Sequence, residues 1–262
     1  MAQMQESCRA WGEAGDFGRC IHGLHRVAGS TRLRQGEISQ MAALEGPQYG
    51  PASGGKPDSL MLLLHGVGAD GFDLIDLAPV WAEALPHTLF IAPHAPFAFQ
   101  GAPYGRQWFD IMDRTPARME AGLRHAAAIL GDFTQAKLAE LGLGGDRLAL
   151  MGFSQGAMVA LFAGLRGAVP APACILAYSG ALLGPETLAA ELTARPPVLL
   201  VHGEADEVVP AMASRQAARA LQAERVPHEL LLRPDLVHGL DDAGLAAGTA
   251  LLARSLGKMT AG

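Results

Sequence analysis

A serine between two glycines stands where a short apolar run gives way to a longer one. Residues 152–156 read Gly-Phe-Ser-Gln-Gly. The run at 147–151 is typical of a strand, and the run at 157–163 is typical of a helix. A serine on a sharp strand-to-helix turn has an exposed Oγ, which suits a nucleophile. Free N–H groups at the start of the following helix stabilise negative charge nearby. Ser154 is therefore the candidate nucleophile.

Two later residues supply the partners that such a serine needs. A serine hydroxyl is a poor nucleophile near neutral pH, so an imidazole must accept its proton and a carboxylate must orient that imidazole. On a strand-turn-helix scaffold the partners follow in the order serine, acid, histidine. Asp206 lies just past the apolar run 198–202, and His238 lies just past the run 229–233. We therefore predict a triad of Ser154 as nucleophile, Asp206 as orienter and His238 as base.

Further acids and histidines near the same predicted strand ends compete for these roles. Glu204 lies two residues before Asp206 and stays open as the acid, although the Asp-Glu-Val-Val-Pro context favours Asp206. Asp235 is too close along the chain to His238 to orient it comfortably. Of the histidines that follow a predicted strand, only His238 comes late enough to follow the acid. The histidines that follow a strand but come too early are His65, His94 and His202.

A glycine-rich loop is the candidate second half of an oxyanion hole. It follows the apolar run 60–64 and reads His-Gly-Val-Gly-Ala-Asp over 65–70. Two backbone N–H groups normally hold the oxyanion, one from the residue after the nucleophile and one from a loop after an early strand. These positions correspond to Gln155 and Val67. An ordinary glycine-rich turn explains the same loop equally well.

The elements that must position these residues alternate along the chain from residue 60 onward. Short apolar runs between longer helical patterns predict an α/β fold, with a mostly parallel central sheet and helices on both faces. Functional residues gather at the carboxyl ends of the strands in such sheets. The expected strands are 60–64, 88–92, 147–151, 173–178, 198–202 and 229–233. The expected helices are 72–85, 118–141, 155–166, 186–192, 211–225 and 241–256.

Composition excludes several classes of protein. The 262 residues are 50% apolar and 18% charged, which allows a large core. A net charge of −6 without a basic stripe argues against a nucleic-acid partner. We find no apolar run of about 18 residues, so no membrane span is expected. Cys8, Cys20 and Cys174 form no zinc or disulfide pattern and suit a reducing compartment. We therefore expect a cytoplasmic protein that needs neither a metal nor another cofactor.

The beginning of the chain differs from the remainder. Residues 1–45 hold scattered charges and glycines without sustained periodicity, and they lack the apolar segment of a secretory signal. Met41 directly precedes the part that carries the motifs. We expect a flexible arm or an extension from an upstream start. The stretch 46–57 is linker-like by composition, and one catalytic domain is expected over 46–262.

Five motifs in order resemble those of the phospholipase/carboxylesterase family of α/β hydrolases, which includes bacterial carboxylesterases and acyl-protein thioesterases. They are residues 64–70, 107–110, 152–156 and 206–210, and the pair 238–239. The resemblance implies an α/β-hydrolase fold over about 46–256, the same triad and the same two oxyanion donors. It also implies that Trp108 and Phe109 bind substrate by lining or supporting the acyl region, although an aromatic core anchor explains Trp108 equally well. The chain departs from the family at 235–237, where a glycine is common.

The expected activity is hydrolysis of small-molecule carboxylic esters with short to medium acyl chains, and of acyl thioesters as a second class, through a serine acyl-enzyme. The sequence does not determine the oligomeric state, and a homodimer is one option. A serine peptidase of the same fold is an alternative, but the chain shows no large extra domain of the kind common in hydrolase-fold oligopeptidases. A non-catalytic binding protein on this scaffold is a second alternative, but such proteins usually have a broken triad.

Overall fold

Parallel strands form the centre of the molecule. The computed structural model describes residues 44–101 and 103–257, so almost all of the predicted arm lies outside the described residues. A seven-stranded sheet has the order β1-β3-β2-β6-β7-β8-β9. β1 runs antiparallel to β3, and every other neighbouring pair is parallel. Its strands are β1 (Gln48–Tyr49), β2 (Ser59–Leu64), β3 (Thr88–Ile91), β6 (Leu148–Phe153), β7 (Cys174–Tyr178), β8 (Val198–Gly203) and β9 (His228–Arg233). The predicted fold class is confirmed.

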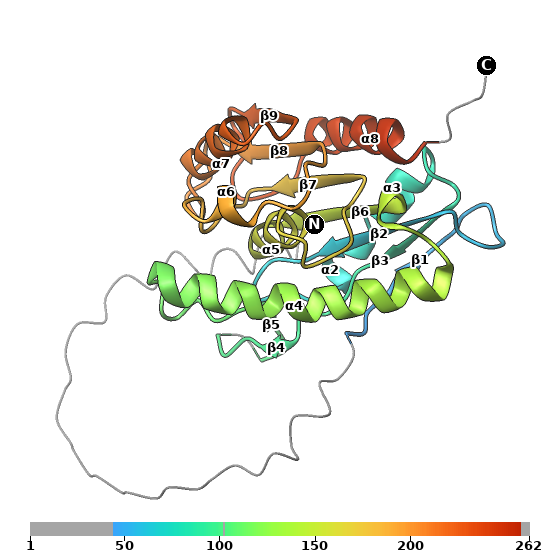
Figure 1. The fold of residues 1–262 in the computed structure, drawn as a ribbon, viewed down its shortest axis with the longest axis horizontal. Coiled ribbons are helices and arrows are strands. Elements are labelled where there is room, and N and C mark those ends of the chain that lie inside the picture. The colour runs from blue at the N-terminus through green and yellow to red at the C-terminus, as the bar shows by residue number, and fades with distance from the viewer. Residues whose placement is uncertain (1–43, 102, 258–262) are drawn as a thin grey trace, which may run out of the picture.

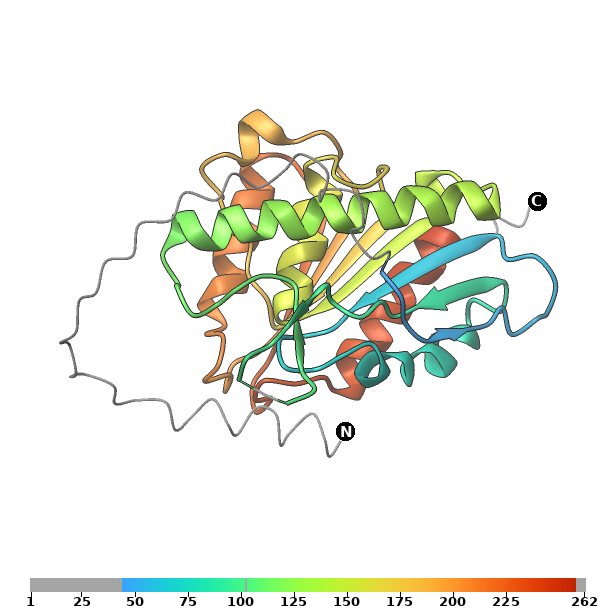
Figure 2. The ribbon, with the colours of Figure 1, turned by 90° about the horizontal axis from the view of Figure 1, so that it is seen from below.

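Helices cover both faces of this sheet (Figures 1 and 2). The longest helix, α4, and the helix that follows Ser154, α5, pack together on one face, where residues of α6 and α7 join the same core. Residues of α2, α3 and α8 form the core on the opposite face. The helices are α2 (Phe72–Ile75), α3 (Ala78–Ala82), α4 (Pro116–Leu141), α5 (Gln155–Leu165), α6 (Leu188–Glu191), α7 (Met212–Ala223) and α8 (Asp242–Leu256), with a 3₁₀ turn at Gly145–Arg147.

The central strands are apolar on both faces because both faces are covered. All six residues of β2 are buried. Leu62 and Leu64 pack into the core under α4 and α5, whereas Met61 and Leu63 pack into the core under α3 and α8. β9 differs because it is the last strand at one edge of the sheet, and none of its residues is fully buried.

Three short features differ from the expectation. The predicted helix 72–85 is two helices, because α2 ends at Ile75 and α3 begins at Ala78 with Pro79 in its first turn. The stretch 46–57, which is linker-like in composition, contributes β1 to the sheet edge. A separate ladder pairs β4 (Phe97–Ala98) with β5 (Arg106–Gln107). Strands of two residues have no detectable alternation, which is why the sequence did not indicate them.

Parallel pairing brings the carboxyl ends of several strands to one edge. In the register, Leu64 of β2 faces Gly152 of β6, Phe153 faces Tyr178 of β7, and Gly203 of β8 faces Arg233 of β9. The loops that carry Val67, Ser154, Asp206 and His238 therefore leave the sheet at the same edge. None of the helices in the described part of the chain is both long and apolar enough to cross a membrane.

Candidate active site

The turn at Ser154 is held in a conformation that few residues adopt. Ser154 has φ 54° and ψ −116°, and its N–H donates to the Tyr178 carbonyl at 2.9 Å. The flanking glycines make this turn feasible. A Cβ on Gly152 would overlap the backbone of Gly156, and a Cβ on Gly156 would overlap the Leu64 carbonyl. Backbone strain of this kind persists where the surrounding structure fixes it, and it is typical of functional sites.

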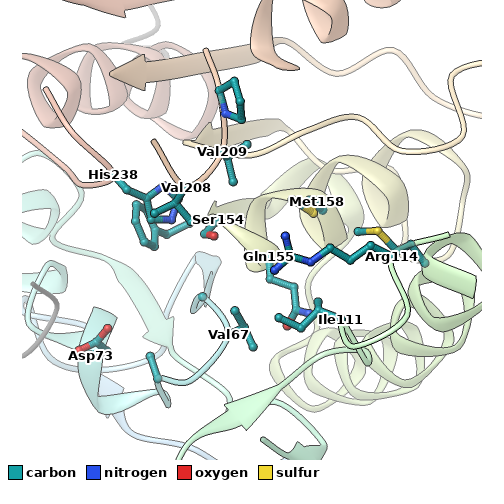
Figure 3. Close-up of a pocket in the computed structure, with 15 residues that line it drawn as sticks. Val67, Asp73, Ile111, Arg114, Ser154, Gln155, Met158, Val208, Val209 and His238 are labelled. Atoms are coloured by element: carbon teal, nitrogen blue, oxygen red, sulfur yellow. The ribbon is translucent and has the colours of Figure 1, made fainter. Parts of the chain in front are cut away.

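Asp206 and His238 form a hydrogen-bonded acid–base pair. His238 Nδ1 lies 2.7 Å from Asp206 Oδ2. The other carboxylate oxygen, Oδ1, accepts from the N–H groups of Val208 and Val209 at 2.9 and 2.8 Å. The ring of Phe153 packs against the His238 ring, with 4.8 Å between centroids. His238 and Ser154 line the same cavity (Figure 3). The structure thus brings the three predicted triad residues together.

A second histidine completes the surroundings of Asp206. His202 Nε2 lies 3.2 Å from Asp206 Oδ2 and 2.7 Å from the Val209 carbonyl, and Nδ1 lies 2.7 Å from Ser214 Oγ. A carbonyl can only accept, so Nε2 carries a proton, which faces the Val209 carbonyl and the Asp206 carboxylate. Burial acts to raise the pKa of the Asp206 carboxyl, but the hydrogen bonds from His202 and His238 hold it well below its usual range.

The sequence did not indicate this role of His202. His202 is the fifth residue of β8, where it was a candidate base, but its side chain is fully buried and faces the acid. Its position at the carboxyl end of the strand that leads to Asp206 was the only available signal. Ser214, in the first turn of α7, gave no signal, because only the tertiary structure brings α7 against the end of β8.

Apart from His202, the acids and histidines that compete with Asp206 and His238 by sequence position form no hydrogen bond or ion pair with that pair among the described residues. Glu204 binds Arg215 at 2.6 Å on the surface. Asp235 is exposed. His94 accepts from the Gly71 N–H at 3.0 Å. His65 is fully buried, where Nδ1 donates to the Gly66 carbonyl and Nε2 accepts from the Ala95 N–H at 2.9 Å. Burial lowers the pKa of His65 to about 4, so this ring is neutral and structural.

Val67 and Gln155 line the cavity beside Ser154. The loop that carries Val67 approaches the nucleophile closely, since a Cβ on Gly66 would lie 3.4 Å from the Ser154 Cβ. No acceptor among the described residues takes a hydrogen bond from the Val67 N–H. The Gln155 N–H is in the first turn of α5, where helices leave N–H groups without internal partners. Both donors are thus available to a ligand.

The Gln155 side chain has a separate role that the sequence did not reveal. Its Oε1 accepts from the Trp108 N–H at 2.8 Å, and its Nε2 donates to the Phe109 carbonyl at 2.8 Å. Trp108 Nε1 donates to the His65 carbonyl at 3.0 Å. Trp108 and Phe109 are fully buried, and neither lines the cavity. The structure places both aromatic residues behind the site, where they support the two loops that meet at Ser154.

The cavity at Ser154 has a volume of about 200 Å³ and mostly apolar walls. Ile111, Met119 and Met158 form its wall on the α4–α5 side. Besides His238, its charged or titratable lining residues are Asp73 and Arg114. Among residues 44–101 and 103–257, no group of three or more histidine, cysteine or acidic side chains is placed to hold a metal ion.

Comparison with known proteins agrees with this architecture. The chain is 32% identical to acyl-protein thioesterase 1 of Schizosaccharomyces pombe over 170 residues, which cover 62% of this chain and 74% of that protein. It is 27% identical to esterase YpfH of Escherichia coli over 187 residues, which cover 71% of this chain and 78% of that protein. The crystal structure of esterase PE8 superposes with a TM-score of 0.77 at 40% identity, covering 82% of this chain and all of that chain.

The family model described as phospholipase/carboxylesterase matches residues 52–253, which is most of the chain. This match agrees with the motif order and with the helix-covered parallel sheet. The chain therefore belongs to the phospholipase/carboxylesterase family of α/β hydrolases and is an enzyme of the carboxylesterase or thioesterase type.

Proposed function

We propose that this enzyme hydrolyses carboxylic esters, and acyl thioesters as a second class, through a Ser154-His238-Asp206 triad. The observation that carries the proposal is the 2.7 Å hydrogen bond to Asp206 from His238, which lines the same cavity as Ser154. Nδ1 of His238 faces the acid, so Nε2 is the nitrogen left for the serine. This is the arrangement in which an imidazole activates a hydroxyl.

The reaction would proceed in two halves. His238 Nε2 takes the Ser154 proton as Oγ attacks the acyl carbon, and the N–H groups of Val67 and Gln155 stabilise the oxyanion. The bond to the leaving alcohol or thiol breaks as His238 returns the proton to that oxygen or sulfur. Water, deprotonated by the same imidazole, then releases the acid from Ser154. Loss of one oxyanion donor typically lowers turnover by roughly 10²–10³-fold.

The cavity supports a preference for short to medium acyl chains. Its volume of about 200 Å³ is small for an apolar ligand site, and Ile111 and Met119 are part of its apolar wall. Residues 46–262 remain the proposed catalytic domain. A cytoplasmic location, the lack of a cofactor or nucleic-acid partner, and a homodimer as one option remain predictions from the sequence.

The test is Ser154→Ala, assayed with an aryl butyrate ester and with a fluorophosphonate label. The substitution should lower kcat/KM by roughly 10³-fold or more and abolish labelling. Ser53→Ala is the matched control, because Ser53 is exposed in a loop near the opposite ends of the strands and should leave both signals intact. Undiminished hydrolysis by the Ser154 variant would refute the proposal. Hydrolysis of peptides in preference to esters would favour a peptidase.

A further inference from the structure

A groove lies beside His238, next to the cavity at Ser154. Because the acyl chain of the substrate would occupy that cavity, we call it the acyl cavity. It has a volume of about 720 Å³ and runs between α3 and α8, beside the loop that follows β9. Asp73 and His238 line both hollows, so the groove adjoins the candidate active site. Its floor is apolar, and it is formed mainly by Leu74, Leu77, Val80, Leu236, Val237 and Leu245.

This apolar surface is open to a ligand. Val80 on α3 and Val237 in the loop after β9 leave 49% and 55% of their surface exposed. Contiguous exposed apolar surface is typical of binding sites. The position beside His238 relates this surface to the reaction.

The charge of the groove is of one sign. Its lining includes four carboxylates and, among the described residues, no lysine or arginine. The described part of the chain provides no ion-pair partner for any of the four. Burial raises the pKa of Asp73, and the neighbouring carboxylates of Asp70 and Asp76 raise it further. The four are Asp73, Asp76, Glu83 and Asp242.

The geometry of the triad places the leaving group in this direction. His238 must hand its proton to the departing oxygen or sulfur, so that atom lies against the His238 ring. In Figure 3, Ile111, Arg114 and Met158 lie on one side of Ser154, whereas His238 and Asp73 lie on the other. An acyl chain in the cavity beside Met158 therefore leaves the alcohol or thiol pointing past His238 toward Asp73 and the groove.

We propose that the groove is the leaving-group subsite and that it selects an alcohol or thiol with a cationic nitrogen on an apolar body. The inference rests on the proposed function and specifies its substrate class. The apolar floor would bury the carbon atoms around the nitrogen, and the carboxylates would attract its charge. The cation needs no further chemistry: the acyl–sulfur or acyl–oxygen bond breaks, His238 supplies the proton, and the cationic product leaves.

The test compares two thioesters that differ in one atom. Butyrylthiocholine carries a trimethylammonium group, and the S-(3,3-dimethylbutyl) thioester of butyrate has carbon in place of that nitrogen. At about 50 mM salt, kcat/KM for the cationic ester should exceed that for the neutral one by about tenfold, since an exposed ion pair contributes a factor of about 1.4 to 5, and four carboxylates at about 1.8 each multiply to about ten. The preference should shrink to about twofold at 0.5 M salt, because counterions screen exposed charges.

Charge-removing variants assign the effect to the groove. The double variant Asp76→Asn/Glu83→Gln should reduce the cationic-to-neutral ratio at least threefold without touching the acyl cavity. Asp73→Asn should reduce the ratio as well. Asp132→Asn is the matched control, because Asp132 is exposed on α4, on the opposite face of the sheet, and its loss should leave the ratio unchanged.

The outcomes separate this inference from the proposed function. Ser154-dependent hydrolysis of both thioesters at equal rates would overturn the cationic subsite and leave the triad proposal intact. The cationic subsite would also be overturned if the groove variants and the Asp132 variant changed the cationic-to-neutral ratio equally. If neither thioester nor the aryl ester is hydrolysed in a Ser154-dependent way, both proposals fail.

Discussion

Replacement of Gln155 by methionine tests how the site is supported from behind. Methionine keeps the length of the side chain but removes both hydrogen bonds to the Trp108–Phe109 backbone. The Trp108 N–H and the Phe109 carbonyl belong to fully buried residues, so neither gains water as a substitute. Each unpaired buried group costs about 1–3 kcal/mol, and the free energy of unfolding should therefore fall by about 2–6 kcal/mol.

Urea titration and thermal unfolding measure this loss. For a domain of this size, each kcal/mol shifts Tm by about 2–4 °C, so the Gln155→Met variant should melt roughly 4–24 °C below the wild type. The matched control is Gln135→Met. Gln135 is exposed on α4, and its replacement should change stability by less than about 0.5 kcal/mol. If the two variants unfold alike, the Gln155 side chain does not hold this segment.

A Gln155→Glu variant tests the hydrogen bond to the Phe109 carbonyl separately. A glutamate oxygen can still accept from the Trp108 N–H, but the other oxygen meets the Phe109 carbonyl and needs a proton to bond it. Folding should therefore raise the pKa of this glutamate. A group with a raised folded pKa stabilises below its unfolded pKa and loses that contribution as pH rises through the folded value. The stability gap to wild type should thus widen from pH 4 to pH 8. A gap that is constant with pH refutes the reasoning.

Three further predictions follow from buried groups. The pKa of His65 is about 4 in the folded protein, against its ordinary value of 6.5, so the unfolded chain binds a proton at a higher pH than the folded protein does. The free energy of unfolding should therefore fall by about 3 kcal/mol as pH drops from about 6.5 to about 4. Urea titrations of His65→Gln should lack that component, and an unchanged pH dependence would contradict it. His202→Ala should lower kcat about tenfold with little change in KM, since Asp206 loses a charge-assisted hydrogen bond, and Ser214→Ala should cost less. Equal kinetics for wild type and the His202 variant would show that the acid needs no such support. Burial raises the pKa of Cys174 to about 12, so mass spectrometry should find iodoacetamide on Cys174 only after unfolding, and rapid labelling of the native protein would contradict its burial.

Much of the framework was readable from the sequence because its signals are local. β2, β6, β7 and β8 are continuous apolar runs, which a buried parallel sheet requires. The turn at Ser154 was readable for a related reason. Its two glycines are imposed by backbone contacts within a few residues and with the neighbouring strand, so the pattern is short and specific.

The support of the site could not be read in this way. The bonds of Gln155 to Trp108 and Phe109 span more than 40 residues, and those of His202 to Asp206 and Ser214 depend on how α7 packs beside β8. Each involves a polar residue whose type fits many surface positions equally well. Only the tertiary structure decides which of them turn inward.

The split between α2 and α3 had a weak signal in Pro79. Proline is accepted in the first turn of a helix but not in its interior, so a helix through 72–85 was locally disfavoured. The gathering of acidic residues along the groove could not be predicted from the sequence. Its acidic residues come from α2, the link to α3, the C-cap of α3 and the start of α8, and they meet only because α2, α3 and α8 cover the same face of the sheet.

The place of β9 at the sheet edge has a consequence for how the enzyme loses activity. β9 leads directly to His238, has one neighbouring strand, and keeps all six of its residues at least partly exposed. Edge elements with little buried surface open at a lower free-energy cost than the whole domain. Catalysis should therefore be lost at a urea concentration at which β6 and α5 are still folded. These two central elements hold Ser154 between them. Inactivation would then report detachment of a single strand, well before the fold is lost.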